Sequence, residues 1–273
     1  MAEANIFHPW EGYVEPFQIW GNLYFVGTVP ASTHLIDTGE GLIVIDPGFP
    51  QSLYLVIENI HRLGFKVKDI KYIICTHGHY DHLGAAKALT ELTGAKTFLG
   101  KEDVTYANGT VDLTWARELG VEYHEAFEPD VLLSDGDVIE LGNTRILCKA
   151  APGHTPGTMA FFFDVTDGKK TYRAAMHGGV GRNSMGREFL EQYGLGFEIR
   201  EKFISAIDSM IEEKVDILLG NHVANNDTLG KKARMTDKDN PFIDPNAWKK
   251  FLVSVKEKYF TMIEEEENET RRD

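Results

Sequence analysis

The segment at residues 76–82, THGHYDH, constrains this chain more than any other. It directly follows residues 72–75, an apolar run with the composition of a buried strand. Four of its side chains are of metal-ligand type: His77, His79, Asp81 and His82. Neutral imidazole and carboxylate oxygen suit zinc and similar first-row divalent ions. Packing gives no reason for this density of ligand groups, so the segment indicates a metal site at the end of a strand.

The spacing within this segment suits two metal ions. His77 and His79 lie two apart in the segment that leaves the strand, where alternate side chains point the same way. Asp81 and His82 precede residues 83–89, whose helix formers and apolar stripe predict a helix. Ligands before and after this turn can serve two ions. Such a pair needs further protein ligands, because a catalytic ion takes about three and leaves a position for water.

Two more histidines follow strand-like segments further along. His154 lies in the Gly- and Pro-rich loop 151–158, and His222 follows the short apolar run 215–219. Taken singly, either histidine fits a loop or core role. Three strand ends that deliver histidines in one chain favour a common metal site.

Together these segments resemble the metallo-β-lactamase superfamily. The matching features are the His-x-His-x-Asp-His run, the Gly-His-Thr-Pro-Gly loop at 153–157, the strand-terminal His222, and early strands that end in an Asp-Pro-Gly turn at 46–48. The resemblance covers about residues 17–222. It implies an α/β fold of the four-layer αβ/βα sandwich type, with a binuclear zinc site at one end of the two sheets.

The resemblance also implies a ligand set and a mechanism. The first ion would be held by His77, His79 and His154, and the second by Asp81, His82 and His222. A hydroxide shared by the two ions would be the nucleophile. Asp81 would be catalytic as well as a ligand, because it can accept a hydrogen bond from that hydroxide and orient it.

The chain departs from many family members after residues 171–176. Glyoxalase II and the acyl-homoserine lactonases place a metal-bridging aspartate there, and some β-lactamases a cysteine, whereas this chain has His177-Gly178-Gly179. The all-histidine β-lactamase subclass also lacks a bridging side chain, so the resemblance is closest to that subclass and its uncharacterised hydrolase relatives. Three roles are open for His177: a seventh ligand, a substrate contact or a loop residue.

Strand-like and helix-like runs alternate without a linker or repeat, which predicts one domain over residues 1–273 with an acidic, fraying tail at about 264–273. Strands are predicted near 17–20, 23–28, 32–38, 41–46, 71–75, 96–99, 137–141, 144–150, 158–164, 170–176 and 215–219. Helices are predicted over about 51–63, 81–92, 101–107, 111–119, 197–213 and 245–266.

Two segments are candidate walls of the site. The Gly-rich segment 177–196 leaves a strand whose end should face the metals, so Arg182 is a candidate contact for a substrate carboxylate and Tyr193 or Phe197 for an apolar group. A connection of no special role is the alternative. The second segment is 101–127, with the aromatic residues Tyr106, Trp115, Tyr123 and Phe127, although aromatics at helical spacing are more often core.

Charge and composition narrow the partners. The net charge is −14, from 28 basic and 42 acidic residues, so a small-molecule substrate is expected and nucleic acid is not. No apolar stretch is long enough to span a membrane and residues 1–15 lack a secretory pattern, which predicts a cytoplasmic location. Cys75 and Cys148 are expected to be buried thiols. The oligomeric state is open.

The sequence therefore predicts a hydrolase with two Zn²⁺ ions per chain that cleaves a carbonyl-type bond: lactam, lactone, ester or thioester. We expect it to be β-lactamase-like, with weak β-lactamase activity. The alternatives are a glyoxalase II-like thioesterase or lactonase, an iron-dependent sulfur dioxygenase on the same fold, and a binding protein with a structural metal. The last is disfavoured because structural zinc usually has closed thiolate sites.

Overall fold

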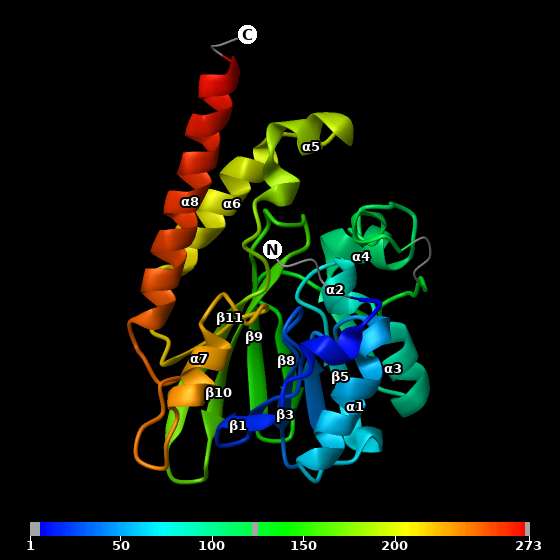
Figure 1. Ribbon diagram of the computed structural model, residues 1–273, viewed down its shortest axis with the longest axis vertical. Helices are drawn as coiled ribbons and strands as arrows, with labels where there is room; N and C mark the ends of the chain where they lie inside the picture. The colour runs from blue at the N-terminus through cyan, green and yellow to red at the C-terminus, as the bar shows by residue number, and fades with distance from the viewer. Residues whose placement is uncertain (1–5, 122–124, 271–273) are drawn as a thin grey trace.

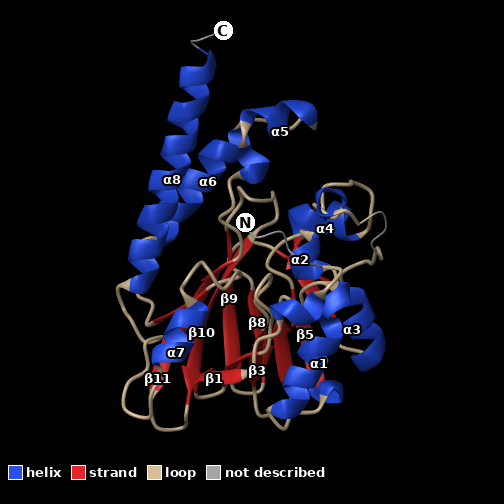
Figure 2. Ribbon diagram, in the orientation of Figure 1, coloured by secondary structure: helices blue, strands red, loops and turns tan. Residues whose placement is uncertain are grey.

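The computed structural model describes residues 6–121 and 125–270. Two β-sheets face each other, and helices cover the outer side of each (Figures 1 and 2). One sheet has seven strands in the order β1-β2-β3-β4-β5-β6-β7, and the other has five in the order β12-β11-β10-β9-β8. The predicted four-layer αβ/βα sandwich is thereby confirmed.

Every predicted strand corresponds to an observed one, and β7 is additional. The strands are β1 Phe17–Trp20, β2 Leu23–Phe25, β3 His34–Asp37, β4 Leu42–Ile45, β5 Ile70–Ile74, β6 Lys96–Gly100, β7 Val131–Leu133, β8 Val138–Leu141, β9 Thr144–Ala150, β10 Met159–Thr166, β11 Thr171–His177 and β12 Ile217–Leu219. The α-helices are α1 Leu53–Arg62, α2 Tyr80–Leu83, α3 Ala86–Thr93, α4 Val104–Ala107, α5 Arg187–Gln192, α6 Glu198–Met210, α7 Thr228–Arg234 and α8 Ala247–Thr270.

Alternating side chains of the central strands fill the layers. Ile43 and Ile45 of β4 pack between the sheets with Phe161 of β10. Leu42 and Val44 of the same strand face the other way and pack with α1 and α3. Because both faces of these strands are covered, they are continuously apolar rather than alternating with polar residues. On the far side, α6 and α8 cover the five-stranded sheet in the same way.

Strand direction gathers the functional segments at one end. The strands β4, β5, β6 and β7 run parallel, so their carboxyl ends share an edge. Backbone hydrogen bonds join the two sheets there: Met159 N donates to Thr76 O at 2.9 Å, and Ser32 N donates to Asn221 O at 3.0 Å. The segments after β5 and β12 and the β9–β10 connection therefore meet at this end.

Two predicted helices differ from the observed ones. The helix predicted over 81–92 is divided, because the N–H of Ala85 donates to Gly48 O instead of continuing α2. The helix predicted over 111–119 is wrong: that segment holds only the 3₁₀ turn Arg117–Leu119. Trp115 has a φ of 66°, in the left-handed region, which no α-helix of L-residues accommodates.

The acidic end of the chain is held rather than frayed, contrary to expectation. Helix α8 extends to Thr270. Glu266 accepts hydrogen bonds from the Arg200 guanidinium at 2.8 Å and from the Arg187 N–H at 2.7 Å. Residues 271–273 of the predicted tail lie outside the described residues.

Both cysteines are buried and free, as predicted. Across residues 6–121 and 125–270, none of the helices combines the length and apolar character needed to cross a bilayer.

Candidate metal centre

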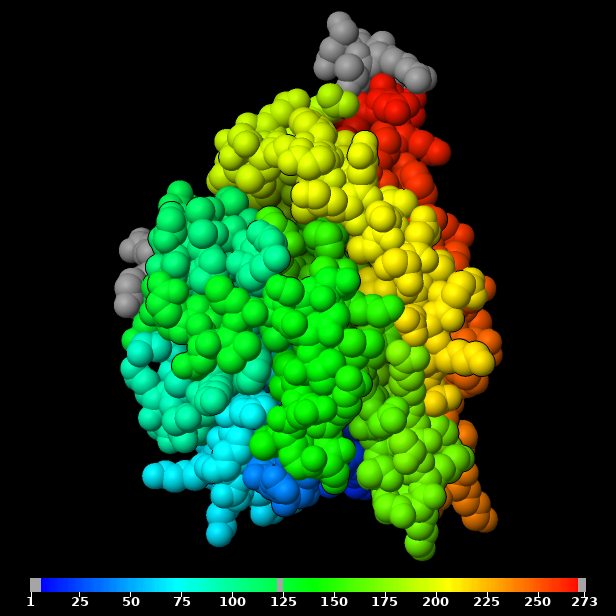
Figure 3. Space-filling view, turned by 180° about the vertical axis from the view of Figure 1, so that it is seen from behind, coloured from blue at the N-terminus to red at the C-terminus, as the bar shows by residue number. Residues whose placement is uncertain are grey.

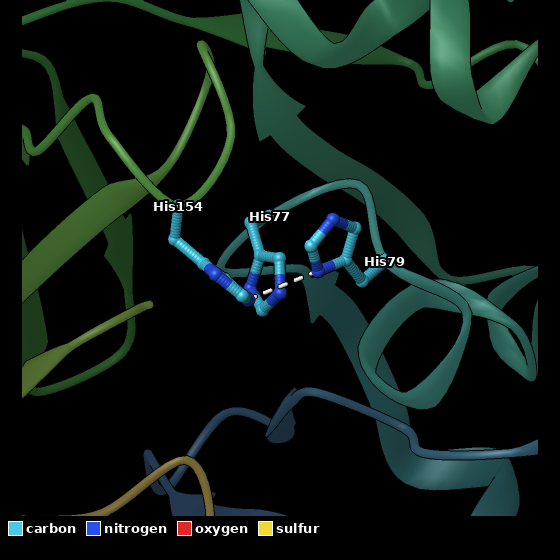
Figure 4. A group of neighbouring side chains, drawn as sticks. All are labelled: His77, His79 and His154. Atoms are coloured by element: carbon cyan, nitrogen blue, oxygen red, sulfur yellow. Dashed lines mark hydrogen bonds between the residues drawn. The ribbon is translucent and has the colours of Figure 1, made fainter. Parts of the chain in front are cut away.

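Three histidines from two loops converge at the end of the sandwich. His77 and His79 follow β5, and His154 lies between β9 and β10 (Figure 4). All three are buried, and one ligand atom of each lies within 4.8 Å of the others. His79 Nδ1 and His154 Nε2 are 2.9 Å apart. Two nitrogens bound tetrahedrally to zinc are about 3.3 Å apart, so this spacing suits a shared cation. We call these residues the first ligand group.

A second group lies against the first. Asp81 and His82, on α2, converge with His77 within 4.8 Å. His222, which follows β12, brings its Nε2 to 3.3 Å from His82 Nε2 and to 3.5 Å from Asp81 Oδ2. We call Asp81, His82 and His222 the second ligand group. The six residues that the sequence singled out as ligands thus lie together in two adjoining sets.

Hydrogen bonds on the outer side of the imidazoles fix their tautomers. The Nδ1–H of His154 donates to Gly181 O at 3.0 Å, and that of His222 donates to Pro30 O at 2.8 Å. A carbonyl oxygen can only accept, so Nδ1 carries the proton and Nε2 presents a lone pair to the centre. His77 Nε2 is buried without a hydrogen-bond partner among the described residues. Such a donor set fits a bound cation.

Asp46 supports both His82 and the strand end. Its backbone has a φ of 53° in the turn after β4, a left-handed conformation that aims the carboxylate at β5. One oxygen accepts from Thr76 N at 2.7 Å, and the other from Thr76 Oγ1 at 2.7 Å and from His82 Nδ1 at 2.8 Å. A carboxylate behind a ligating imidazole orients the ring and raises its basicity.

The electrostatics keep the histidines of the first ligand group neutral, as metal ligands must be. Burial lowers the pKa of His154 to about 4 and holds the pKa of His77 and His79 well below the usual range. Burial also acts to raise the pKa of Asp81, but the neighbouring imidazoles outweigh it and hold that pKa below its usual range. Burial acts to lower the pKa of His82, yet the carboxylates on either side raise it to about 10. A cation on Nε2 would take the place of that proton.

Asp103 is a functional residue that the sequence did not reveal. It is fully buried just before α4, and its Oδ2 accepts from Gly78 N at 2.7 Å and from Thr155 Oγ1 at 2.5 Å. Its Oδ1 accepts from Gly157 N at 2.6 Å. It therefore joins the loop of His77 and His79 to the loop of His154. An aspartate beside a lysine and a glutamate at a helix start gives no signal of this role, because the same pattern is usual at solvated helix ends.

The structure places two candidate substrate contacts, His177 and Arg182, outside the two ligand groups. His177 ends β11, is buried behind His154 and belongs to neither ligand group among the described residues. Arg182 donates to Lys258 O on α8 at 2.7 Å. The guanidinium is thus engaged with the outer helix, and its contact with a substrate carboxylate stays a prediction.

Tyr193 instead joins the two expected walls. Its hydroxyl donates to Glu118 at 3.0 Å, and its ring packs on Phe189 with centroids 4.7 Å apart. Phe189 contacts Trp115 at 5.1 Å, and Trp115 contacts the ring of His79 at 5.8 Å. Figure 3 shows the α5–α6 segment, in yellow-green and yellow, above the teal and green 101–121 segment.

The other aromatic residues of the second wall divide between site and core. Tyr106 is buried beside Gly78, whereas Phe127 packs on the core beneath α1 and α3. Tyr123 lies outside the described residues.

Known proteins are similar to this chain in fold or sequence. BJP-1, a subclass B3 metallo-β-lactamase of Bradyrhizobium japonicum, superposes with a TM-score of 0.86 at 29% identity, covering 97% of this chain and 99% of that one. The class B3 di-zinc metallo-β-lactamase LRA-12 from an Alaskan soil metagenome gives a TM-score of 0.81 at 29% identity, covering 93% and 96%. Hydroxyacylglutathione hydrolase GloC of Haemophilus influenzae is 27% identical over 209 residues, 76% of this chain and 90% of GloC.

Sequence similarity to other curated relatives is more local. The alignments with the first two of them span 61% and 54% of those proteins' own lengths. The family model for the metallo-β-lactamase superfamily matches residues 26–167, just over half of the chain. The match includes five of the six ligand residues, and His222 completes the set from β12. The predicted resemblance is confirmed: the chain belongs to the metallo-β-lactamase superfamily.

Proposed function

We propose that this chain is a hydrolase that holds two Zn²⁺ ions and cleaves a carbonyl-type bond of a small molecule. The observation that carries the proposal is the convergence of six ligand-type side chains, of which His82, His154 and His222 are oriented by hydrogen bonds on the outer side of their rings. When bound, the ions polarise the carbonyl and supply hydroxide at neutral pH. Similarity to the di-zinc enzyme LRA-12 supports the metal assignment.

Asp81 has both a ligand role and an orienting role in this proposal. Its Oδ2 is 3.2 Å from His82 Nε2, and its side chain is 18% exposed while that of His82 is fully buried. It can therefore accept a hydrogen bond from an attacking water that enters from the open side. His77 and His82 lie beneath, where burial excludes bulk water.

The surroundings favour substrates without a carboxylate. Lys202 is the one cation among the described residues that line the cavity beside His79 and His154, and Arg182 is engaged with α8. A β-lactam carries a carboxylate that a dedicated lactamase must hold. We therefore expect a kcat/KM on β-lactams below about 10⁴ M⁻¹s⁻¹. A lactone, ester or thioester fits better, and the similarity to GloC supports a thioesterase.

Metal analysis of protein purified without added metal tests the cofactor. About two zinc ions per chain supports the proposal, whereas about one iron would favour the sulfur dioxygenase alternative. His79→Ala should lower zinc content and abolish hydrolysis. Asp81→Asn should retain part of the zinc with a large loss of rate. His61→Ala, at an exposed histidine on α1, is the matched control and should change neither.

A substrate panel tests the reaction class. It should contain a chromogenic cephalosporin, a lactone, an aryl ester, a glutathione thioester and a phosphodiester. Turnover of the carbonyl substrates that is lost in His79→Ala supports the proposal. Zinc-loaded protein that cleaves none of them would overturn it, and efficient turnover of penicillins and cephalosporins would make the chain a dedicated lactamase.

Three further expectations, on location, domain number and nucleic-acid binding, remain proposals. A cytoplasmic location is supported by the two buried free cysteines, which suit a reducing compartment, and cell fractionation tests it. A single domain over residues 1–273 should give one cooperative unfolding transition. The absence of a nucleic-acid partner, proposed from the net charge of −14, is checked by titration with labelled RNA and DNA.

A further inference from the structure

A cavity of about 230 Å³ opens beside the first ligand group. His79 and His154 lie at its inner side, whereas Asp81, His82 and His222 do not line it. The cavity therefore leads away from one side of the metal centre only. A substrate whose carbonyl lies at that centre would direct one of its two halves into this space.

The walls are mostly apolar and come from segments far apart in the chain. The apolar residues include Leu113 from the 101–121 segment, Pro156 from the His154 loop, Leu190 of α5 and Leu195 just after that helix. The hydroxyls of Thr155 and Ser184, which also line the cavity, donate to Asp103 and to His154 O. Apolar walls favour an apolar occupant, because burying its surface is worth about 25 cal/mol per Å².

Charge at the edge of the cavity is balanced. Lys202 and Glu198 both line it, and they lie four residues apart on α6 with opposite signs. An ionised group deeper inside the cavity would lose its hydration. Because Glu198 already balances the charge of Lys202, no free opposite charge would replace that hydration. The cavity therefore selects for an uncharged group.

The volume bounds the length of that group. An apolar cavity of about 150 Å³ holds one benzene molecule. The present cavity, at about 230 Å³, is half as large again and has room for a phenyl ring with a short spacer. An aliphatic chain of about six to eight carbons occupies similar space.

A residue packed against the cavity wall has a strained backbone. Trp115, with its φ of 66°, contacts both His79 and Phe189, and Phe189 lines the cavity. A bulky residue stays in the left-handed region only when its surroundings over-determine it, and such strain concentrates at functional sites. The Tyr193–Glu118 hydrogen bond joins the same two segments a second time.

We propose that this cavity binds the acyl half of the substrate. The preferred substrate is an ester or thioester whose acyl chain has about six to eight carbons and carries no charged group. The inference rests on the proposed hydrolase function and adds the substrate class. The carbonyl carbon lies at the metal centre, the acyl chain extends past His79 toward Leu195, and the leaving thiol or alcohol departs on the side of the second ligand group.

Thioesters of N-acetylcysteamine test this, because they share one small leaving group while the acyl chain varies. From acetyl through butanoyl to hexanoyl, kcat/KM should rise about fourfold per methylene, and the rise should stop by dodecanoyl. Adipoyl is a six-carbon acyl group that ends in a carboxylate instead of a methyl group. Its kcat/KM should be at least tenfold lower than that of hexanoyl. Equal kcat/KM for acetyl and hexanoyl would overturn the inference while leaving the hydrolase proposal intact.

Cavity-filling variants locate the effect. Leu195→Trp should lower kcat/KM for hexanoyl at least tenfold while changing that for acetyl less than threefold. Ile199→Phe is a second filling variant if the first folds poorly. Leu92→Trp, at an exposed leucine on α3, is the matched control and should alter neither substrate. Equal losses for both substrates in both filling variants would refute the placement of the acyl chain.

Equilibrium binding separates the inference from the proposed function. Hexanoate should raise the melting temperature more than acetate at equal concentration, and Leu195→Trp should remove the difference. If no thioester is cleaved but this difference is seen, the hydrolase proposal fails and the apolar cavity stands. If thioesters are cleaved but the two acids bind alike, the cavity assignment fails.

Discussion

Replacing Asp103 by asparagine separates the two histidine loops without touching a ligand. The buried carboxylate accepts from Gly78 N and Thr155 Oγ1 on one oxygen and from Gly157 N on the other. Asparagine has one acceptor oxygen, and its amino group donates, so it can accept from Gly78 N or from Gly157 N but not from both. A backbone N–H of the other loop then loses its acceptor while remaining buried.

The size of the effect follows from the bonds involved. A hydrogen bond to a charged group contributes about 1.5–3 kcal/mol, and an orphaned buried donor costs a similar amount. Thr155 can redirect its hydroxyl to Thr158 Oγ1, 2.8 Å away, which limits the loss to one N–H. We expect a destabilisation of about 2 kcal/mol and a melting temperature lower by about 4–8 °C. The affinity of the first ligand group for zinc should fall about 10- to 100-fold.

Competition with a chromophoric chelator measures the two zinc affinities, and thermal unfolding of the chelated protein measures stability alone. The matched control is Asp130→Asn, because Asp130 accepts from Thr97 N and Thr97 Oγ1 at 2.8 and 2.9 Å and contacts neither histidine loop. Because both bonds go to one oxygen of Asp130, the amide oxygen of asparagine can accept them, so the control should keep its stability and both affinities. If Asp103→Asn binds both zinc ions as tightly as wild type, the carboxylate does not set the spacing of the loops.

Three further outcomes are expected. Burial lowers the pKa of His34 to about 4, so between pH 4 and 6.5 the unfolded chain binds a proton at this residue that the folded chain does not. Stability of the chelated protein should fall as pH drops through that window, and His34 should contribute up to about 1.4 kcal/mol per pH unit beside the other buried histidines. In urea unfolding at pH 7, 6 and 5, His34→Leu should reduce the slope by that contribution. Chelator titration should remove the ion of the second ligand group first, because the His222 side chain is 32% exposed, and loss of both ions in one step contradicts this. His177→Ala should keep about two zinc ions per chain; loss of one would identify His177 as a ligand.

The strand pattern and the candidate ligands could be predicted from sequence because they depend on local order. Apolar runs mark the strands, and three strand ends followed by histidines pointed to a common site. The residues alone did not show that β5 belongs to one sheet and that β9, β10 and β12 belong to the other. The helix expected over 81–92 shows the limit of such reasoning. Gly84 approaches Tyr80 O so closely that a side chain would collide with it, and only the folded structure reveals that crowding.

Contacts between distant segments could not be predicted in the same way. Trp115 lies in a segment with helical composition, yet its contacts with His79 and Phe189 place it in a non-helical conformation. Arg182 was expected at the substrate because the Gly-rich loop leaves a metal-facing strand, but α8, which lies much later in the chain, supplies its partner. Tertiary packing determines the conformation of Trp115 and the partner of Arg182, and the neighbouring sequence carries no signal of either.

Each ligand group draws on both sheets. His79 leaves β5 of the seven-stranded sheet and meets His154 of the five-stranded sheet, 75 positions away, and His82 meets His222 across 140 positions. A bound ion would thus act as a cross-link that closes a long loop, and such closures restrict the unfolded chain most when the loop is long. With the ions removed, the two sheets should begin to separate at this end, while the apolar core keeps them packed together at the other end. Hydrogen exchange should then speed up at the tips of β5, β10 and β12 before it reaches β1, so the ions proposed for the chemistry would also hold the two sheets together.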